Sequence, residues 1–109
     1  MISEDAILDF AASAIASIGA LELLLTLKQE TSGLTSEELV RKLRGSEGAV
    51  SEALTQLTNS GLIAEVGGAY LYRPAQTEKK DLVVALETLY REKPMAVISA
   101  IARAPSRRP

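Results

Sequence analysis

Hydrophobic positions recur at helical spacing through the first thirty residues of the chain. Ser3 is suited to cap a helix with an acidic first turn, since acidic side chains favour the positive end of the helix dipole. The apolar positions that follow are Ile7, Leu8, Ala11, Ala14, Ile15 and Ile18. Ser17 and Gly19 interrupt the pattern. Residues 4–30 therefore form either one long helix or two, and in the second case Leu21, Leu24 and Leu25, with Leu27 as a further candidate, line the buried face of the second helix.

Two short amphipathic helices around a tight break are predicted for the middle of the chain. Thr31-Ser32-Gly33 is a stop signal, and Thr35 with Glu38 three positions later forms a capping box for the next helix. Gly45-Ser46 breaks that helix, and Ser60-Gly61 ends the one that follows. The inner faces of the two helices are predicted to consist of Leu39, Val40 and Leu43, and of Val50, Leu54 and Leu57.

A hairpin and a last helical region complete the expected elements. Gly67-Gly68 is a two-residue turn between strands at 62–66 and 69–72. Tyr70 and Tyr72 share one face of the return strand, where we expect them to cover the core edge or a dimer partner. Helix begins again near Lys79, and Pro94 either kinks it or starts a new helix. Near the C-terminus, Arg103, Arg107 and Arg108 form either a basic arm or a solubilising terminus.

The middle segment resembles winged-helix regulators of the MarR and ArsR type. The likeness rests on TSEELVRKL, AVSEALTQLTNSGLI and AEVGGAYLYRP, and it covers roughly residues 17–74. It implies a mainly α fold with a small β-hairpin wing, that is, a winged helix-turn-helix with extra N- and C-terminal helices. We expect one domain of 109 residues, composed of an N-terminal helical extension (1–16), the winged-helix core (17–74), C-terminal dimerisation helices (79–104) and a tail (105–109).

The resemblance implies transcription regulation by a homodimer bound to duplex DNA, with the second helix of the motif in the major groove. Basic residues would contact phosphates, whereas hydroxyl and amide side chains would bond to base edges. The candidate DNA-binding residues are Arg41, Lys42, Arg44, Ser46, Ser51, Thr55, Gln56, Asn59 and Arg73.

Charge favours a different interpretation of the same segment. The helix that should read DNA, Glu47 to Asn59, contains no Lys and no Arg, and the whole chain has a formal charge of −2. Residues 30–66 hold six acidic against three basic side chains. Because phosphate contacts supply most of the affinity for DNA, a winged-helix protein–protein interaction module without DNA binding is the alternative function.

The terminal helices predict a homodimer. A winged-helix core needs only about 60–70 residues, so the flanking apolar stripes are expected to exceed what the core buries. The candidate dimer interface consists of Ile7, Ala11, Ala14, Ile15, Leu86, Leu89, Tyr90, Val97, Ile98 and Ile101.

Composition narrows the chemistry. The chain has no Cys and no His, which removes thiol chemistry and the usual zinc ligands and general bases. It shows no nucleophile–base pair, Gly-rich phosphate loop or metal cluster, so we expect neither an enzyme nor a cofactor. The N-terminus lacks the basic start of a signal peptide, and polar residues interrupt the longest apolar run, Ala11 to Leu27. A cytoplasmic protein without a membrane span is expected.

Overall fold

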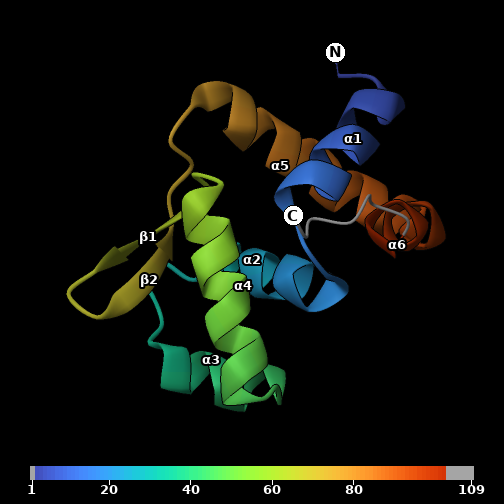
Figure 1. Ribbon diagram of the computed structural model, residues 1–109. Coiled ribbons are helices and arrows are strands. Elements are labelled where there is room, and N and C mark those ends of the chain that lie inside the picture. Colours follow the sequence, from blue (N-terminus) through green and yellow to red (C-terminus); the bar gives the residue numbers. More distant parts are fainter. Residues whose placement is uncertain (1, 103–109) are drawn as a thin grey trace.

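Helices dominate the computed structural model, which describes residues 2–102, and a single two-stranded hairpin lies among them (Figure 1). The elements are α1 (Glu4–Ala14), α2 (Ile18–Gln29), α3 (Ser36–Leu43), α4 (Glu47–Asn59), β1 (Ile63–Val66), β2 (Ala69–Tyr72), α5 (Thr77–Glu92) and α6 (Pro94–Ala102). The mainly α class with a small hairpin is thus confirmed. The basic residues Arg103, Arg107 and Arg108 and the predicted tail 105–109 lie outside the described residues.

The first thirty residues form two helices with a sharp break between them. Ser17 adopts an extended conformation, and its Oγ accepts a hydrogen bond from the Ala20 amide at 3.1 Å, which caps α2. The axes of α1 and α2 differ in direction by 103°. No single described helix is long and apolar enough to cross a membrane; α1 and α2 reach the required length and apolar composition only as this bent pair.

The predicted capping box at the start of α3 is present. The Glu38 amide donates to Thr35 Oγ1 at 3.2 Å, and the Thr35 amide donates to Glu38 Oε1 at 2.9 Å. The helix ends at Arg44, which has the left-handed backbone conformation with φ 56°. Ser46 then caps α4 by accepting from the Ala49 amide at 3.1 Å. The short connection between α3 and α4 therefore consists of a reversal at Arg44, Gly45 and the Ser46 cap of α4.

The hairpin is fixed by its turn and by a bridge to the α2–α3 connection. Gly67 and Gly68 both have positive φ, 63° and 88°, as a tight two-residue turn requires, and Val66 pairs with Ala69 across it. Close to the turn, Leu34 forms an antiparallel bridge with Tyr70, with N–O distances of 3.0 and 2.7 Å. This bridge joins the α2–α3 connection to β2 and holds the hairpin beside α3 and α4.

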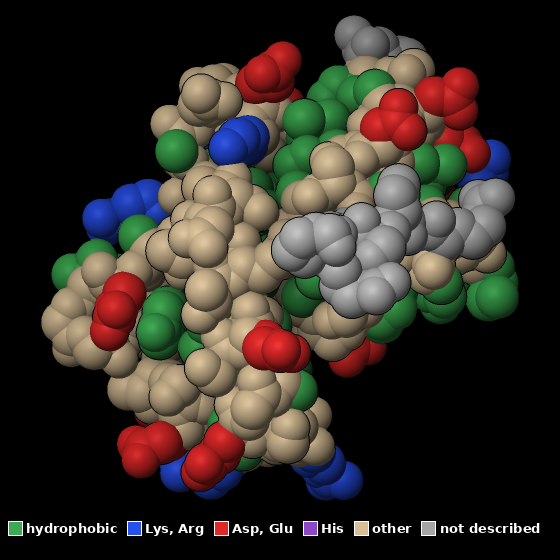
Figure 2. Space-filling view, viewed as in Figure 1, with side chains coloured by type: hydrophobic (Ala, Val, Ile, Leu, Met, Phe, Trp, Pro, Cys, Tyr) green, Lys and Arg blue, Asp and Glu red, His purple; other side chains and the backbone are tan. Residues whose placement is uncertain are grey.

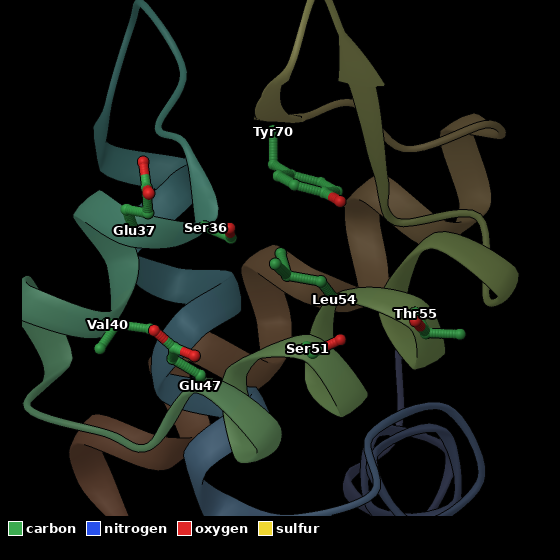
Figure 3. Close-up of a pocket in the computed structure, with 8 residues that line it drawn as sticks. All are labelled: Ser36, Glu37, Val40, Glu47, Ser51, Leu54, Thr55 and Tyr70. Atoms are coloured by element: carbon green, nitrogen blue, oxygen red, sulfur yellow. The ribbon is translucent and has the colours of Figure 1, made fainter.

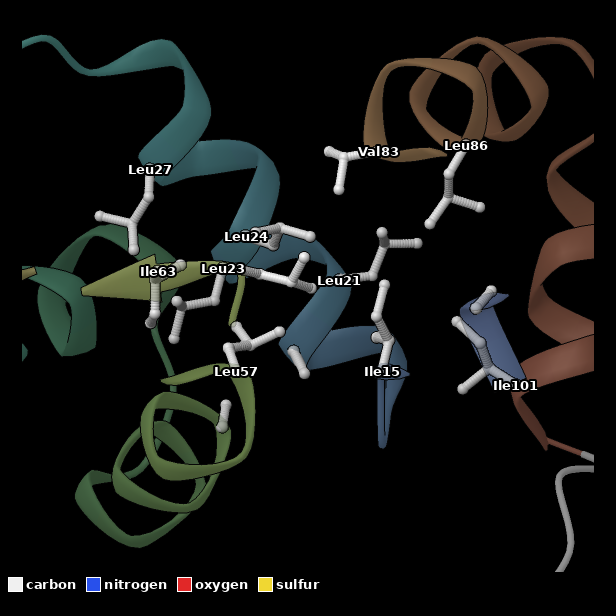
Figure 4. Close-up of a cluster of buried hydrophobic side chains, with 14 of the residues drawn as sticks. Ile15, Leu21, Leu23, Leu24, Leu27, Leu57, Ile63, Val83, Leu86 and Ile101 are labelled. Atoms are coloured by element: carbon white, nitrogen blue, oxygen red, sulfur yellow. The ribbon is translucent and has the colours of Figure 1, made fainter. Parts of the chain in front are cut away.

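Helix α2 lies at the centre of the core. It packs against α3, α4 and β2, and Figure 4 shows its side chains between Leu57 and Ile63 on one side and Val83 and Leu86 on the other. Leu21, Leu24 and Leu27 are buried as predicted, whereas Leu25 is only partly buried and Leu23 is buried in addition. The buried face of α2 is therefore shifted towards Leu23, because the helix is covered on two sides.

The terminal helices close the other half of the same core. Helix α1 packs against α5 and α6, and α5 packs against α6. Seven of the ten candidate dimer residues are buried within the chain, and Ala14, Tyr90 and Ile98 are partly buried. The buried seven are Ile7, Ala11, Ile15, Leu86, Leu89, Val97 and Ile101. The expected surplus of exposed apolar surface on these stripes was wrong, because the three helices cover one another.

Pro94 starts a new helix instead of kinking an old one. It is the first residue of α6, a position that tolerates proline because the missing N–H would be unpaired there anyway. Lys93, between α5 and α6, pairs with Glu4 of α1 at 3.1 Å. This exposed ion pair joins the two ends of the described chain. Helix α5 begins at Thr77, two residues before the predicted start.

Truncation at the centre of the core provides a test of this packing. Leu21 is completely buried, so Leu21→Ala is expected to lower the free energy of unfolding by about 2–5 kcal/mol through lost burial and a residual cavity. Met95 is 67% exposed, and Met95→Ala should change stability by less than about 0.5 kcal/mol. Urea denaturation followed by circular dichroism measures both. Equal effects of the two substitutions would contradict the central position of α2.

Candidate interaction face around α4

Helix α4 presents an outer face that is polar and bears negative charge. Its inner side is anchored in the core by Val50, Leu54 and Leu57, while Glu47 and Glu52 are exposed. Figure 2 looks onto this face and shows acidic side chains along the lower part of α4, with basic side chains at the margins. The structure therefore places no cation on the helix that the resemblance assigns to the DNA major groove.

Two of the predicted base-contacting residues have structural roles. Ser46 caps α4, as described above. The Gln56 amide group accepts from the Ala16 N–H at 3.3 Å and donates to the carbonyl of Ala14. Ser60 Oγ donates to the same carbonyl at 3.2 Å. The Gln56 side chain thus fastens the α1–α2 connection to α4 instead of facing outward.

The remaining polar candidates on α4 do face outward. Ser51, Thr55 and Asn59 are exposed, and their side chains make no hydrogen bond within residues 2–102. They lie on two successive turns and the end of the helix. Of the predicted base-contacting residues on α4, these three are the ones whose side chains the structure leaves available to an external partner.

The predicted phosphate-binding cations lie at the edges of the face. Arg41 and Arg44 are exposed at the end of α3, and Lys42 Nζ lies 3.7 Å from a carboxylate oxygen of Glu30. Arg73 is exposed beyond the end of β2, where its amide donates to the carbonyl of Leu62 at 3.1 Å. The structure does not bring these cations together over α4.

Sequence reasoning missed the role of Lys79. Its Nζ donates to the backbone carbonyl of Ser60 at 2.7 Å, where the negative end of α4 favours a cation. The two residues are nineteen positions apart, and no local signal connects them. With Gln56 and Ser60, this contact ties the C-terminal end of α4 to α5 and to the α1–α2 connection.

A hollow of about 360 Å³ lies between α3, α4 and β2, on the flank of α4 that faces the hairpin and towards the N-terminal half of that helix (Figure 3). Val40 of α3, Leu54 of α4 and the ring of Tyr70 of β2 give it apolar walls. Its polar lining consists of Ser36, Glu37, Glu47, Ser51 and Thr55. Glu37 and Glu47 are exposed and form no ion pair with any described residue. This is a small, partly apolar hollow with two unpaired carboxylates.

The opposite flank of α4 is also hollowed. Two adjoining spaces of about 110 and 540 Å³ separate α4 from the first turn of α2. Their walls are mostly Ala, Gly and Ser, and the charged residues lining them are Glu22 and Glu52. Helix α4 therefore stands as a ridge between hollows that carry negative charge on both sides.

The two tyrosines of β2 cover the edge of the core, which confirms one of the two predicted roles. Both are partly buried and pack against the buried cluster. The hydroxyl of Tyr72 is buried without a hydrogen-bond partner among the described residues. Burial, and secondly the negative charge of Glu87, raise the pKa of Tyr72 above the usual 10.0. Glu87 itself pairs with Lys28 of α2 at 3.0 Å.

Comparison with known proteins gives no family. No protein-family model matches the chain, and no curated protein sequence matches it significantly. Among residues 2–102, no group of three or more acidic side chains is placed to hold a metal ion. The geometry of the α4 face is therefore what a functional proposal has to rest on.

Substitution of Gln56 tests whether its side chain stabilises the fold or is free to contact a ligand. Gln56→Ala should lower the free energy of unfolding by about 1–3 kcal/mol, because it leaves the Ala16 amide without its side-chain acceptor and weakens the hold on Ala14. Asn59→Ala, on the same helix but without such bonds, is the matched control and should cost less than about 0.5 kcal/mol. Chemical denaturation gives both values. A neutral Gln56→Ala would show that the amide is free to bind a ligand.

Tyr72→Phe is expected to leave stability unchanged or to raise it at neutral pH, because it removes a buried hydroxyl that lacks a partner. The raised pKa means that the folded protein keeps the phenol proton longer than the unfolded chain. The wild-type protein should therefore lose stability as the pH rises above about 10, and Tyr72→Phe should lose less. Denaturation at neutral and alkaline pH, with Tyr70→Phe as control, checks both statements.

Proposed function

We propose that residues 18–72 form a winged helix-turn-helix, with α3 and α4 as the two helices of the motif and the β1–β2 hairpin as the wing. The order of elements supports this assignment, as does the tight capped connection between α3 and α4. The bridge between Leu34 and Tyr70 supports it too, because it adds a short third strand segment beside the hairpin.

We propose that this module docks a protein partner through the outer face of α4. The observation that carries the proposal is the negative charge on both flanks of the helix. Of the residues that line the hollows there, four are charged and all four are glutamates: Glu22, Glu37, Glu47 and Glu52.

Electrostatics favours a protein over DNA at this surface. Duplex DNA binds by replacing counterions with Lys and Arg, and carboxylates at the groove entrance oppose that. A partner with basic groups is attracted by the same carboxylates, which speeds its encounter and fixes its orientation. In addition, Ser46 caps α4 and Gln56 bonds to the α1–α2 connection. Of the predicted base-contacting residues on α4, this leaves Ser51, Thr55 and Asn59.

Duplex DNA binding by a homodimeric transcription regulator is the second candidate. The observation that favours it is the exposure of Arg41 and Arg44 at the end of α3, directly before α4, with Arg73 exposed beyond the hairpin. A homodimer of this chain would need a surface other than the buried stripes of α1, α5 and α6.

Site-specific photo-cross-linking tests the docking proposal. A benzophenone amino acid replaces Ala49 or Thr55, one on each flank of α4, and Thr88 of α5 as an exposed control. In the native host, the two α4 positions should cross-link the same protein and the control position should not. Glu47→Gln with Glu52→Gln should lower the cross-linked fraction about fivefold, since two exposed ion pairs contribute on the order of 1 kcal/mol together. Equal cross-linking at all three positions, unchanged by the double substitution, would refute docking.

The same double variant separates the two candidates in a DNA-binding assay. In a DNA reader, Glu47→Gln with Glu52→Gln removes repulsion and should strengthen non-specific binding at low salt. Arg44→Ala should flatten the salt dependence by about one unit of slope. For the docking module we expect no retention of duplex DNA at low salt by fluorescence anisotropy. Tight, salt-sensitive binding that requires Arg44 would instead establish the second candidate.

A further inference from the structure

We infer that the hollow between α3, α4 and β2 receives a single arginine side chain from the partner protein. This inference rests on the proposed docking function and adds the chemistry of the contact. The hollow is the one on the flank of α4 that faces the hairpin, and Figure 3 shows the side chains that line it.

The size of the hollow suits one long side chain. Its volume of about 360 Å³ lies near the lower end of the range for small-molecule pockets, which runs from about 300 to 1,000 Å³. Its lining mixes apolar walls with hydroxyl and carboxylate groups, and in the described chain no Lys or Arg lines it. An amphipathic side chain with an apolar stem and a cationic head fits this combination.

The arrangement of the walls distinguishes the two ends of such a side chain. Figure 3 shows the Tyr70 ring above Leu54, with Val40 and the two glutamates on the side towards α3. The methylene stem can lie against Leu54 and the ring, as long charged side chains do on apolar surfaces. The guanidinium at the end of that stem can then donate to the carboxylates on the side towards α3, and its planar donors match a carboxylate better than an ammonium group does.

The two carboxylates also stabilise the helices that carry them, and an experiment must distinguish this effect from ligand binding. Glu37 and Glu47 lie in the first turns of α3 and α4, where negative charge stabilises a helix. Helix stabilisation requires only the position along each helix. It does not account for a shared hollow with an aromatic wall contributed by a third element, β2.

Other ligand classes fit the hollow less well. An anion such as phosphate would be repelled by the two unpaired carboxylates. A divalent cation usually takes six or more oxygen ligands, and the described residues place no third acidic group beside Glu37 and Glu47. An arginine side chain brings its own donors and needs only the acceptors that are present.

NMR titration of the full chain with N-acetylarginine methylamide tests the inference. Saturable shifts are expected for the backbone amides of Ser51, Leu54 and Thr55, which line the hollow. The citrulline analogue has the same shape without the charge and should bind several-fold more weakly. Raised salt should weaken the arginine analogue alone. Shifts that are absent, unsaturable or equal for the two analogues would overturn the assignment.

Variants of matched helix position serve as controls. Glu37→Gln and Glu47→Gln should each weaken arginine binding about threefold to fivefold, and Tyr70→Leu should weaken it by a similar factor. Glu78→Gln removes an acid from the second position of α5, the position that Glu37 has in α3, without bordering the hollow, and should leave binding unchanged. Equal losses in Glu37→Gln and Glu78→Gln would mean that only helix stability was altered.

The outcome is separable from that of the docking proposal. If the arginine analogue does not bind but the α4 cross-links persist, the docking face stands and the arginine assignment fails. If arginine binds and no cross-link forms at either position on α4, the hollow is a cation site and its assignment to a protein partner is wrong. Loss of both results removes both proposals.

Discussion

The burial of α2 on two sides is the constraint on which the rest of the structure depends. Its leucines fill the space between the α4–hairpin layer and the α5 layer, and residues 2–102 contain no buried polar or charged residue. A helix covered in this way cannot be stabilised by a three-helix motif and a hairpin alone. The terminal helices α1, α5 and α6 close the core on the other side, and their apolar stripes are therefore buried inside the chain.

The same arrangement divides α4 into two unequal ends. Its C-terminal end is held by Gln56 and Ser60, which both donate to the carbonyl of Ala14, and by Lys79, which donates to the carbonyl of Ser60. Its N-terminal half has the Ser46 cap and the contact with α3, and it borders the hollow between α3, α4 and β2. A partner that binds there meets a helix anchored at its far end, so little backbone ordering needs to accompany binding.

Local features of the fold were predictable from sequence, whereas contacts between distant segments were not. The capping box of Thr35 and the Gly67-Gly68 turn involve neighbours within three residues, so their residue types specify them directly. The role of Gln56 depends on a carbonyl 42 positions away, and the Lys93–Glu4 pair spans 89 positions. For the candidate site, the absence of cations on α4 could be predicted directly from the sequence. The hollow could not be predicted, because residues from three separate elements line it.

The left-handed conformation of Arg44 sets one charge at a defined place on the molecule. A side-chain-bearing residue in this region costs roughly 1–2 kcal/mol that a glycine would not, and a glycine follows immediately at position 45. With Arg44 at the reversal, a guanidinium sits two residues before the Ser46 cap, next to a face that is otherwise negative. The turn thus gives the surface a local electric dipole, negative over α4 and positive at its margin, so that an approaching molecule is rotated as well as attracted.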